Sequence, residues 1–139
     1  MIQKFFNLPI KTNGQKLYDF TYHIEQWIIK NSFKHGIINI SIQHTSASLI
    51  IQENADSAVQ ADLLTYFDKL VPMDIDLYTH NAEGKDDMPA HIKSSLTNNQ
   101  ISLSVKDGNL LLGTWQGVYL FEHRINQQNR IVVLHYLGD

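Results

Sequence analysis

The first half of the chain switches between strand-like and helix-like patterns of apolar residues. Partial alternation predicts a strand over residues 2–11, followed by a polar turn over 12–14. Apolar residues at helical spacing then predict an amphipathic helix over Gln15–Lys30. Two apolar runs rich in β-branched residues predict further strands over 37–42 and 47–52.

A second helix and a long polar loop follow in the middle of the chain. Asp56 is a suitable N-cap for this helix, and Pro72 ends it because proline cannot continue a helix. Residues 73–88 are polar and irregular, and a loop of that length in a compact domain is usually functional or disordered. Pro89 is expected to be the first residue of a short helix that carries His91.

The last third of the sequence predicts strands only. Residues 101–105 alternate between apolar and polar side chains, and Asp107-Gly108 is a strong hairpin signal. Three further strands are expected over 109–113, 115–124 and 130–137, with a polar turn over 126–129. We therefore expect a single α+β domain over residues 1–139 with a mainly antiparallel sheet.

Composition excludes several classes of protein. Apolar residues make up 43% and charged residues 18%, which is typical of a globular chain rather than a disordered one. The absence of cysteine excludes disulfides and thiolate metal sites. A net charge of −3 argues against nucleic acid as a partner, although one local cation can still hold a phosphate-bearing small molecule. Without a signal peptide or membrane-length apolar run, we expect a soluble, cytoplasmic protein with no membrane partner.

Three of the seven histidines lie where loop-like sequence meets ordered sequence, namely His44, His80 and His91. Neutral imidazole is the commonest metal ligand in proteins, and three histidines with one open position are a frequent form of catalytic zinc site. The eleven-residue spacing of His80 and His91 matches no short metal motif, so two solvated loop histidines fit the pattern equally well. His44 ends an apolar strand, where a histidine bonded to backbone is the simpler interpretation.

Two further segments contain residues suited to binding or catalysis. Trp115 and Gln116 stand between glycines, so the ring could stack on a flat ligand while the amide pairs with its edge. A core tryptophan relieved by small neighbours explains the same pattern. Glu53 is a possible general base, whereas Asp56 is more simply a helix cap.

Charged residues near the end of the 115–124 strand complete the candidates. Glu122 and Arg124 share one face of that strand and form an ordinary ion pair unless a metal or phosphate lies nearby. Lys93, close to a helix start, is a second candidate for binding phosphate. The remaining four histidines are interpreted as structural or surface residues: His23, His35, His123 and His135.

Taken together, four segments resemble the YjbQ family, also called UPF0047 or the secondary thiamine-phosphate synthase family. They are Gln43–Leu49, Glu53-Asn54, Glu83–Leu96 and Gly113–Arg124, which occur in the expected order over nearly the whole chain. The resemblance implies an α+β fold with sheets packed as a sandwich and a few flanking helices, a homotrimer and a metal-binding pocket.

The resemblance also assigns roles to individual residues. It implies metal binding by His44, His80 and His91. It places the family's acidic, aromatic and basic positions on Glu53, Asp87, Trp115, Gln116, Glu122 and Arg124.

Three functions remain open from the sequence. The family name implies weak joining of hydroxymethylpyrimidine pyrophosphate and thiazole phosphate to thiamine phosphate, with Lys93 and Arg124 neutralising the departing pyrophosphate. Three histidines suit zinc, whereas pyrophosphate chemistry usually uses magnesium held by oxygen ligands. A metal-dependent hydrolase with Glu53 or Asp87 as its base is therefore an alternative, and so is a non-catalytic trimer that binds a metal or ligand.

Overall fold

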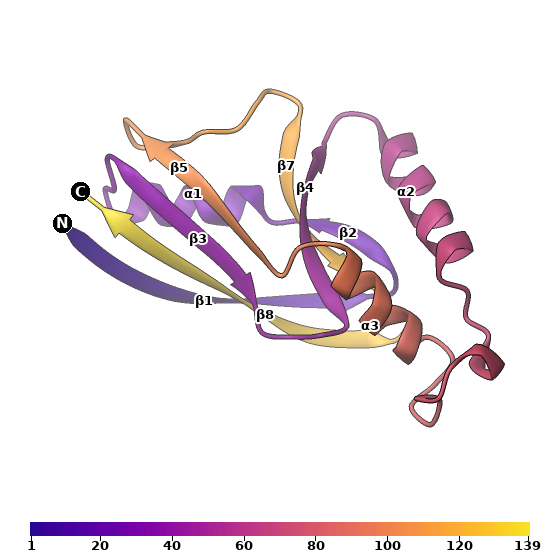
Figure 1. The fold of residues 1–139 in the computed structure, drawn as a ribbon. Helices are drawn as coiled ribbons and strands as arrows, with labels where there is room; N and C mark the ends of the chain where they lie inside the picture. Colours follow the sequence, from indigo (N-terminus) through magenta and orange to yellow (C-terminus); the bar gives the residue numbers. More distant parts are fainter.

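Two antiparallel β-sheets form the frame of the computed structural model, which describes residues 1–139 (Figure 1). The elements in chain order are β1 (Ile2–Asn13), β2 (Lys16–Asp19), α1 (Thr21–Lys30), β3 (Gly36–Ile42), β4 (Ala47–Glu53), α2 (Ser57–Leu70), η1 (Ile75–Leu77), α3 (Asp87–Leu96), β5 (Gln100–Lys106), β6 (Asn109–Leu110), β7 (Gln116–Glu122) and β8 (Gln127–Gly138). None of the helices is long and apolar enough to cross a membrane.

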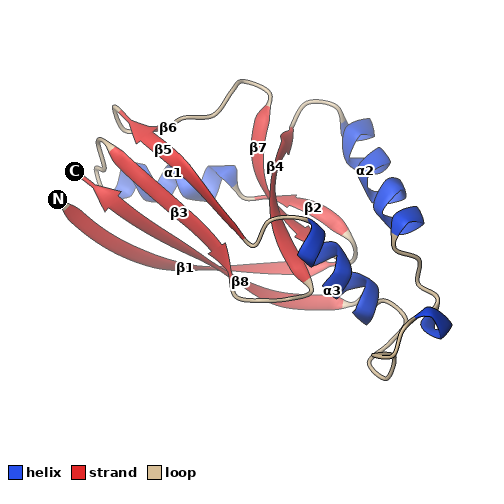
Figure 2. Cartoon of the chain, viewed as in Figure 1, coloured by secondary structure: helices blue, strands red, loops and turns tan.

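The larger sheet has the strand order β1-β8-β3-β5-β6, and the smaller one has the order β2-β7-β4. β1 and β8 pair along their whole length, from Ile2 opposite Gly138 to Asn13 opposite Gln127, so the two chain ends lie side by side (Figure 1). α3 lies beside β4, the edge strand of the smaller sheet (Figure 2).

The main core fills the space between the two sheets and α1. Its side chains come from α1, from β3 and β8 of the larger sheet, and from β4 and β7 of the smaller one. The opposite face of the smaller sheet packs against α2, whose Leu63, Leu64 and Phe67 cover Tyr119 and Phe121. The smaller sheet is therefore a middle layer that is covered on both faces.

Being central in this middle layer, β7 is buried on both sides from Gly117 to Glu122. Alternation along the strand sends Val118 and Leu120 into the main core and the neighbouring aromatic rings toward α2. Gly117 has no side chain because the ring of Tyr119 occupies the space, and a Cβ there would lie 2.9 Å from that ring. One of the two glycines around Trp115 thus has a packing role.

Glu122 ends β7 as a fully buried carboxylate, at 0% exposure. It accepts hydrogen bonds from Nε (2.7 Å) and Nη2 (2.6 Å) of Arg130 on β8 and from the Thr12 hydroxyl (2.5 Å) on β1. Its second oxygen also accepts from the backbone N–H groups of His123 and Arg124. This single carboxylate therefore ties the smaller sheet to two strands of the larger one.

The α+β architecture with mainly antiparallel sheets confirms the expectation from the sequence, as do the two strands after α1 and the helix capped by Asp56. Asp107 and Gly108 both have positive φ angles in the tight turn after β5, as the hairpin signal predicted. The periodic patterns were informative wherever one face of an element is buried and the other is exposed.

Several predicted boundaries were wrong. The helix expected from Gln15 begins at Thr21, because residues 16–19 pair with β7 and Leu17 is buried in that pairing. The strand expected over 109–113 is only two residues long, and β8 begins at Gln127, inside the expected polar turn. For β2 and β8, pairing with a strand far away in the sequence sets the limit, and local patterns do not contain that information.

The expected start of α3 was also wrong, and this error affects the site. The helix begins at Asp87 rather than at Pro89, so that Asp87 is part of its first turn. Proline fits here because its missing N–H would lack an intrahelical partner at this end of the helix anyway.

We predict that Glu122→Gln lowers the free energy of unfolding by about 3–5 kcal/mol, because it leaves the guanidinium of Arg130 buried without its charge partner. Urea unfolding of the variant beside the wild type measures this difference. Glu25→Gln, which removes an exposed carboxylate from α1, is the matched control and should change stability by less than about 0.5 kcal/mol. A loss below about 1 kcal/mol for Glu122→Gln would contradict the role given to the pair.

Candidate functional site

The first turn of α3 places Asp87 and His91 on the same helical face, because residues four apart are neighbours on a helix. Gly84 lies just before this turn with a φ of +104°, and its carbonyl accepts the N–H of Asp87. The loop that ends at this turn brings in His80. Three potential ligands therefore come from 12 consecutive residues, 80–91.

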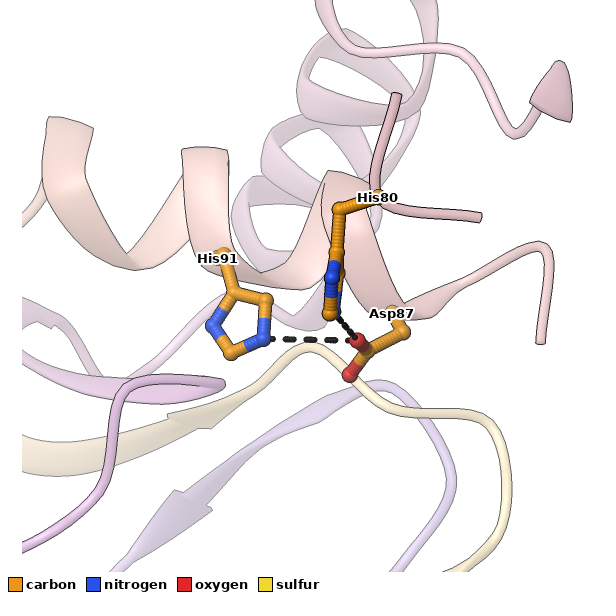
Figure 3. A group of neighbouring side chains, drawn as sticks. All are labelled: His80, Asp87 and His91. Carbon is orange, nitrogen blue, oxygen red and sulfur yellow. Dashed lines mark hydrogen bonds and ion pairs between the residues drawn. The ribbon is translucent and has the colours of Figure 1, made fainter. Parts of the chain in front are cut away.

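The side chains of His80, Asp87 and His91 point toward one another (Figure 3). Oδ2 of Asp87 lies 2.7 Å from Nε2 of His80 and 3.4 Å from Nε2 of His91. One ligand atom from each residue fits within 4.8 Å of the other two. The carboxylate is only 2% exposed, whereas the His80 side chain is 48% exposed, so the cluster opens to solvent on its histidine side.

His91 is held in one orientation by the backbone. Its Nδ1 lies 2.9 Å from the carbonyl oxygen of Thr45, which can only accept a hydrogen bond, so Nδ1 carries the hydrogen. In the neutral ring, Nε2 then presents its lone pair toward the carboxylate of Asp87. Two acceptors that face each other at 3.4 Å require a proton or a cation between them.

Arg124 fixes the other side of the Asp87 carboxylate. Its Nη1 donates to Oδ1 of Asp87 at 2.5 Å, and its Nε donates to Asp86 at 2.9 Å. Burial alone would raise the pKa of Asp86, but hydrogen bonds from the Ile125 amide and from Arg124 outweigh burial and lower it. Arg124 therefore orients Asp87 while leaving Oδ2 free for the histidines.

The donor set fits a divalent transition metal. Two imidazole nitrogens and one carboxylate oxygen form a common catalytic zinc set, and such ligands lie about 2.0–2.2 Å from the metal. Tetrahedral zinc with those bond lengths separates its ligand atoms by about 3.3 Å. The pair formed by Asp87 and His91 already has that spacing, and the exposed His80 would have to move outward by roughly half an ångström.

His44 does not belong to the cluster of His80, Asp87 and His91. Its Nε2 accepts the backbone N–H of Ile131 at 2.9 Å, so that lone pair is already used. Burial and the nearby Arg130 charge lower the pKa of His44, with a smaller opposing effect from Glu122. The next residue, Thr45, nevertheless contacts His91, so His44 is adjacent to the cluster without belonging to it.

Two other candidates are held in ion pairs. Lys93, only 3% exposed, donates to Asp68 of α2 at 2.6 Å. Glu122 is the partner of Arg130 in the buried network between the sheets. Neither side chain is available to a ligand in this arrangement.

The remaining candidates lie at the opposite end of the smaller sheet. β4 pairs with β7 so that Glu53 faces Gln116 at one end and Ala47 faces Glu122 at the other. Six residue steps separate the two ends, or about 20 Å at about 3.3 Å per residue.

At that far end, Trp115 is 63% exposed. Gln116 accepts the backbone N–H of Gly113, and Glu53 accepts those of Ala55 and Asp56. Within one chain, these three residues therefore lie far from the histidine cluster.

Sequence reasoning missed several parts of the cluster. It considered Asp87 as a base, whereas the geometry makes it a potential ligand, and the i,i+4 spacing to His91 was the available signal. Asp86 and Arg130 were not identified because their roles depend on contacts with distant residues. The carbonyl of Thr45 has no side-chain signal at all.

His123 lies in a buried polar network behind α3. Its Nε2 lies 2.8 Å from the Ser48 hydroxyl, which in turn contacts Thr97, and its Nδ1 has no partner. Burial, reinforced by the charges of Lys93 and Arg130, lowers the pKa of His123 to about 3. The ring is therefore neutral at physiological pH and supplies no charge to the cluster.

Comparisons with known proteins agree on one family. Residues 6–139 match the family described as UPF0047 protein YjbQ-like. The UPF0047 protein sll1880 of Synechocystis is 46% identical over 132 residues, covering 95% of this chain and 90% of the relative. UPF0047 protein YjbQ of Salmonella typhimurium is 46% identical over 104 residues, or 75% of each chain. A crystal structure of an uncharacterized YjbQ/UPF0047 protein from Clostridium acetobutylicum has a TM-score of 0.85 at 32% identity, covering 95% of this chain and 99% of the other.

We predict that His123 makes the fold sensitive to acid. The unfolded chain takes up a proton on this ring below about pH 6.5, whereas the folded chain does so only near pH 3, so stability falls as pH drops through that window. Between pH 6.5 and pH 5, the free energy of unfolding measured in urea should fall by about 1.6 kcal/mol more for the wild type than for His123→Gln. Equal losses in the two proteins would contradict a neutral buried ring.

Proposed function

The chain belongs to the YjbQ (UPF0047) family, and we propose that it binds a divalent metal ion, zinc in the first instance, through His80, Asp87 and His91. We propose further that this metal centre acts on a small phosphate-bearing molecule.

The observation that carries the proposal is the unshared Nε2 of His91 facing Oδ2 of Asp87. The Thr45 carbonyl holds the hydrogen of His91 on the far side of the ring, and Arg124 holds Asp87 in place. Such outer contacts are what orient ligand atoms in known metal sites. A bound cation between these two atoms would be attracted to both of them.

A divalent metal at this position would supply Lewis-acid stabilisation of negative charge on a phosphate group. The residues of the chain would leave coordination positions open, because only three side chains converge. The exposed side of His80 is where a ligand would enter. Arg124 would act by orienting Asp87 rather than by holding phosphate, since its donors are used by the chain.

The specific reaction that the family resemblance suggests is the slow synthesis of thiamine phosphate. Its product requires a site for the pyrimidine ring, for which Trp115 and Gln116 are the candidates. Within one chain these residues lie about 20 Å from the end of the sheet that carries the metal ligands. That separation favours a second candidate, a metal-dependent hydrolase that needs no ring-stacking residue beside the metal.

A homotrimer would reconcile the two groups of residues. We propose this assembly because a second copy could bring its exposed Trp115 to the histidine cluster of the first. The thiamine reaction then requires the assembled form, whereas metal binding by residues 80–91 does not.

Native mass spectrometry of protein prepared without chelators or a histidine tag measures both the metal content and the number of chains in each particle. We expect one zinc per chain and three chains per particle. His80→Ala, Asp87→Asn and His91→Ala should weaken zinc binding by at least about tenfold, as expected for loss of a ligand.

Two variants control this experiment. His23→Ala removes an exposed histidine of α1 and should leave zinc binding unchanged. His44→Ala should also retain zinc, because its Nε2 is bonded to Ile131. Metal retained in all variants would refute the site, loss from His44→Ala would refute the three-residue ligand set, and a monomer would refute the trimer.

A direct assay tests the thiamine reaction. Zinc-loaded protein from cells that lack the dedicated synthase is given hydroxymethylpyrimidine pyrophosphate and thiazole phosphate, and thiamine phosphate is measured by chromatography. We expect slow product formation that is lost in His91→Ala and after chelation but kept in His23→Ala. No product from the wild type, or equal product from His91→Ala, would eliminate this reaction and leave the hydrolase as the candidate.

A further inference from the structure

A polar pocket of about 510 Å³ lies beside the histidine cluster, at the point where β3 leads into β4. It is lined by residues 42–46 together with Asn99 and Arg130. No carboxylate lines it, and Arg130 is its only charged residue. This composition differs from that of the metal cluster, where Asp86 and Asp87 add negative charge.

Arg130 offers the pocket an unused donor. Its Nε and Nη2 are both bonded to Glu122, and Nη2 also donates to Ser46. Nη1 has no hydrogen-bond partner in the chain, and it is not among the fully buried polar atoms without a partner. Although Arg130 is only 4% exposed, this nitrogen therefore keeps some contact with solvent. Arg130 lines the pocket, so we place this contact there.

His44 offers a second donor. Because its Nε2 accepts the Ile131 N–H, the neutral ring carries its hydrogen on Nδ1. No group of the chain accepts that hydrogen, and the atom is not fully buried. The amides of Gln43 and Asn99 add further donors at the exposed rim.

We propose that this pocket binds the phosphate group of the ligand whose other end reaches the metal centre. A rigid guanidinium donor, an imidazole N–H and side-chain amides, with no carboxylate among them, match the acceptor oxygens of a phosphate. The pocket adjoins the cluster because Thr45, which lines it, accepts the hydrogen bond of His91. Phosphate binding in this pocket stands by itself, whereas the statement that the other end of the ligand reaches the metal centre rests on the proposed function.

The assignment replaces the two cations that the sequence favoured for phosphate. Lys93 is neutralised by Asp68, and Arg124 by Asp86 and Asp87. Arg130 is also paired, but the pairing uses only one edge of its guanidinium. A phosphate on the remaining edge would be held by a group that Glu122 already fixes in position.

The test uses inorganic phosphate as the probe and metal-free protein. In ¹H–¹⁵N NMR spectra, phosphate should shift the amide signals of residues 43–46, 99 and 130 in a saturable way. Asn99→Asp adds a negative charge at the rim without changing side-chain size, and leaves the pair of Arg130 and Glu122 intact. We expect it to weaken phosphate binding about tenfold through like-charge repulsion.

Asn98→Asp is the matched control, because it makes the same chemical change at an exposed neighbour outside the pocket. It should weaken phosphate binding clearly less than Asn99→Asp does, because the added charge does not line the pocket. Equal weakening by the two variants, or shifts confined to other residues, would overturn the pocket.

The two proposals fail separately. Zinc binding that persists without phosphate shifts at residues 43–46 would overturn the pocket and leave the metal centre. Phosphate shifts in a protein that binds no zinc would support the pocket and overturn the metal centre. Asn99→Asp should keep full zinc content, which distinguishes a local charge effect from damage to the cluster.

Discussion

The buried contact between Glu122 and Arg130 is the interaction on which the rest of the structure depends. It joins the end of β7 in the smaller sheet to β8 and, through Thr12, to β1 in the larger one. Because the same carboxylate accepts the N–H groups of the next two residues, it also sets the direction in which Arg124 leaves the strand. Arg124 in turn holds Asp87, so one ion pair links the packing of the sheets to the geometry of the histidine cluster.

The cations Lys93 and Arg124 near the cluster are both paired with carboxylates of the same chain. Asp86 and Asp87 share Arg124, while Asp68 neutralises Lys93. Cations that look functional in the sequence thus serve to hold carboxylates, which costs less than leaving either charge buried alone. The groups left for a ligand are few and lie on the histidine side of the cluster and in the adjoining pocket.

How far the sequence could predict this arrangement depends on the range of the contacts. Helical spacing and alternation identified the helix after Asp56 and the strands around Ile40, because burial on one face leaves a periodic signal. The same spacing misassigned residues 16–19, since Leu17 is buried through pairing with β7.

For the site, His80, Asp87 and His91 were all identified as individual candidates, and the structure brings them together. The bond between His44 and Ile131, and the pairing of Lys93 with Asp68, join residues 87 and 25 positions apart and left no local pattern to read. The pairing that puts Glu53 and Trp115 at the far end of the sheet is likewise a long-range property.

The position of β8 in the sheet has a consequence for how the protein is made. This strand follows every other one in the sequence, yet it lies between β1 and β3. While a ribosome is still producing the chain, β1 has no partner in the larger sheet, and β3 can pair only with β5. The nascent chain therefore exposes two unpaired strand edges until β8 has been made, and long-range pairing of this kind slows folding and leaves strand edges open to aggregation.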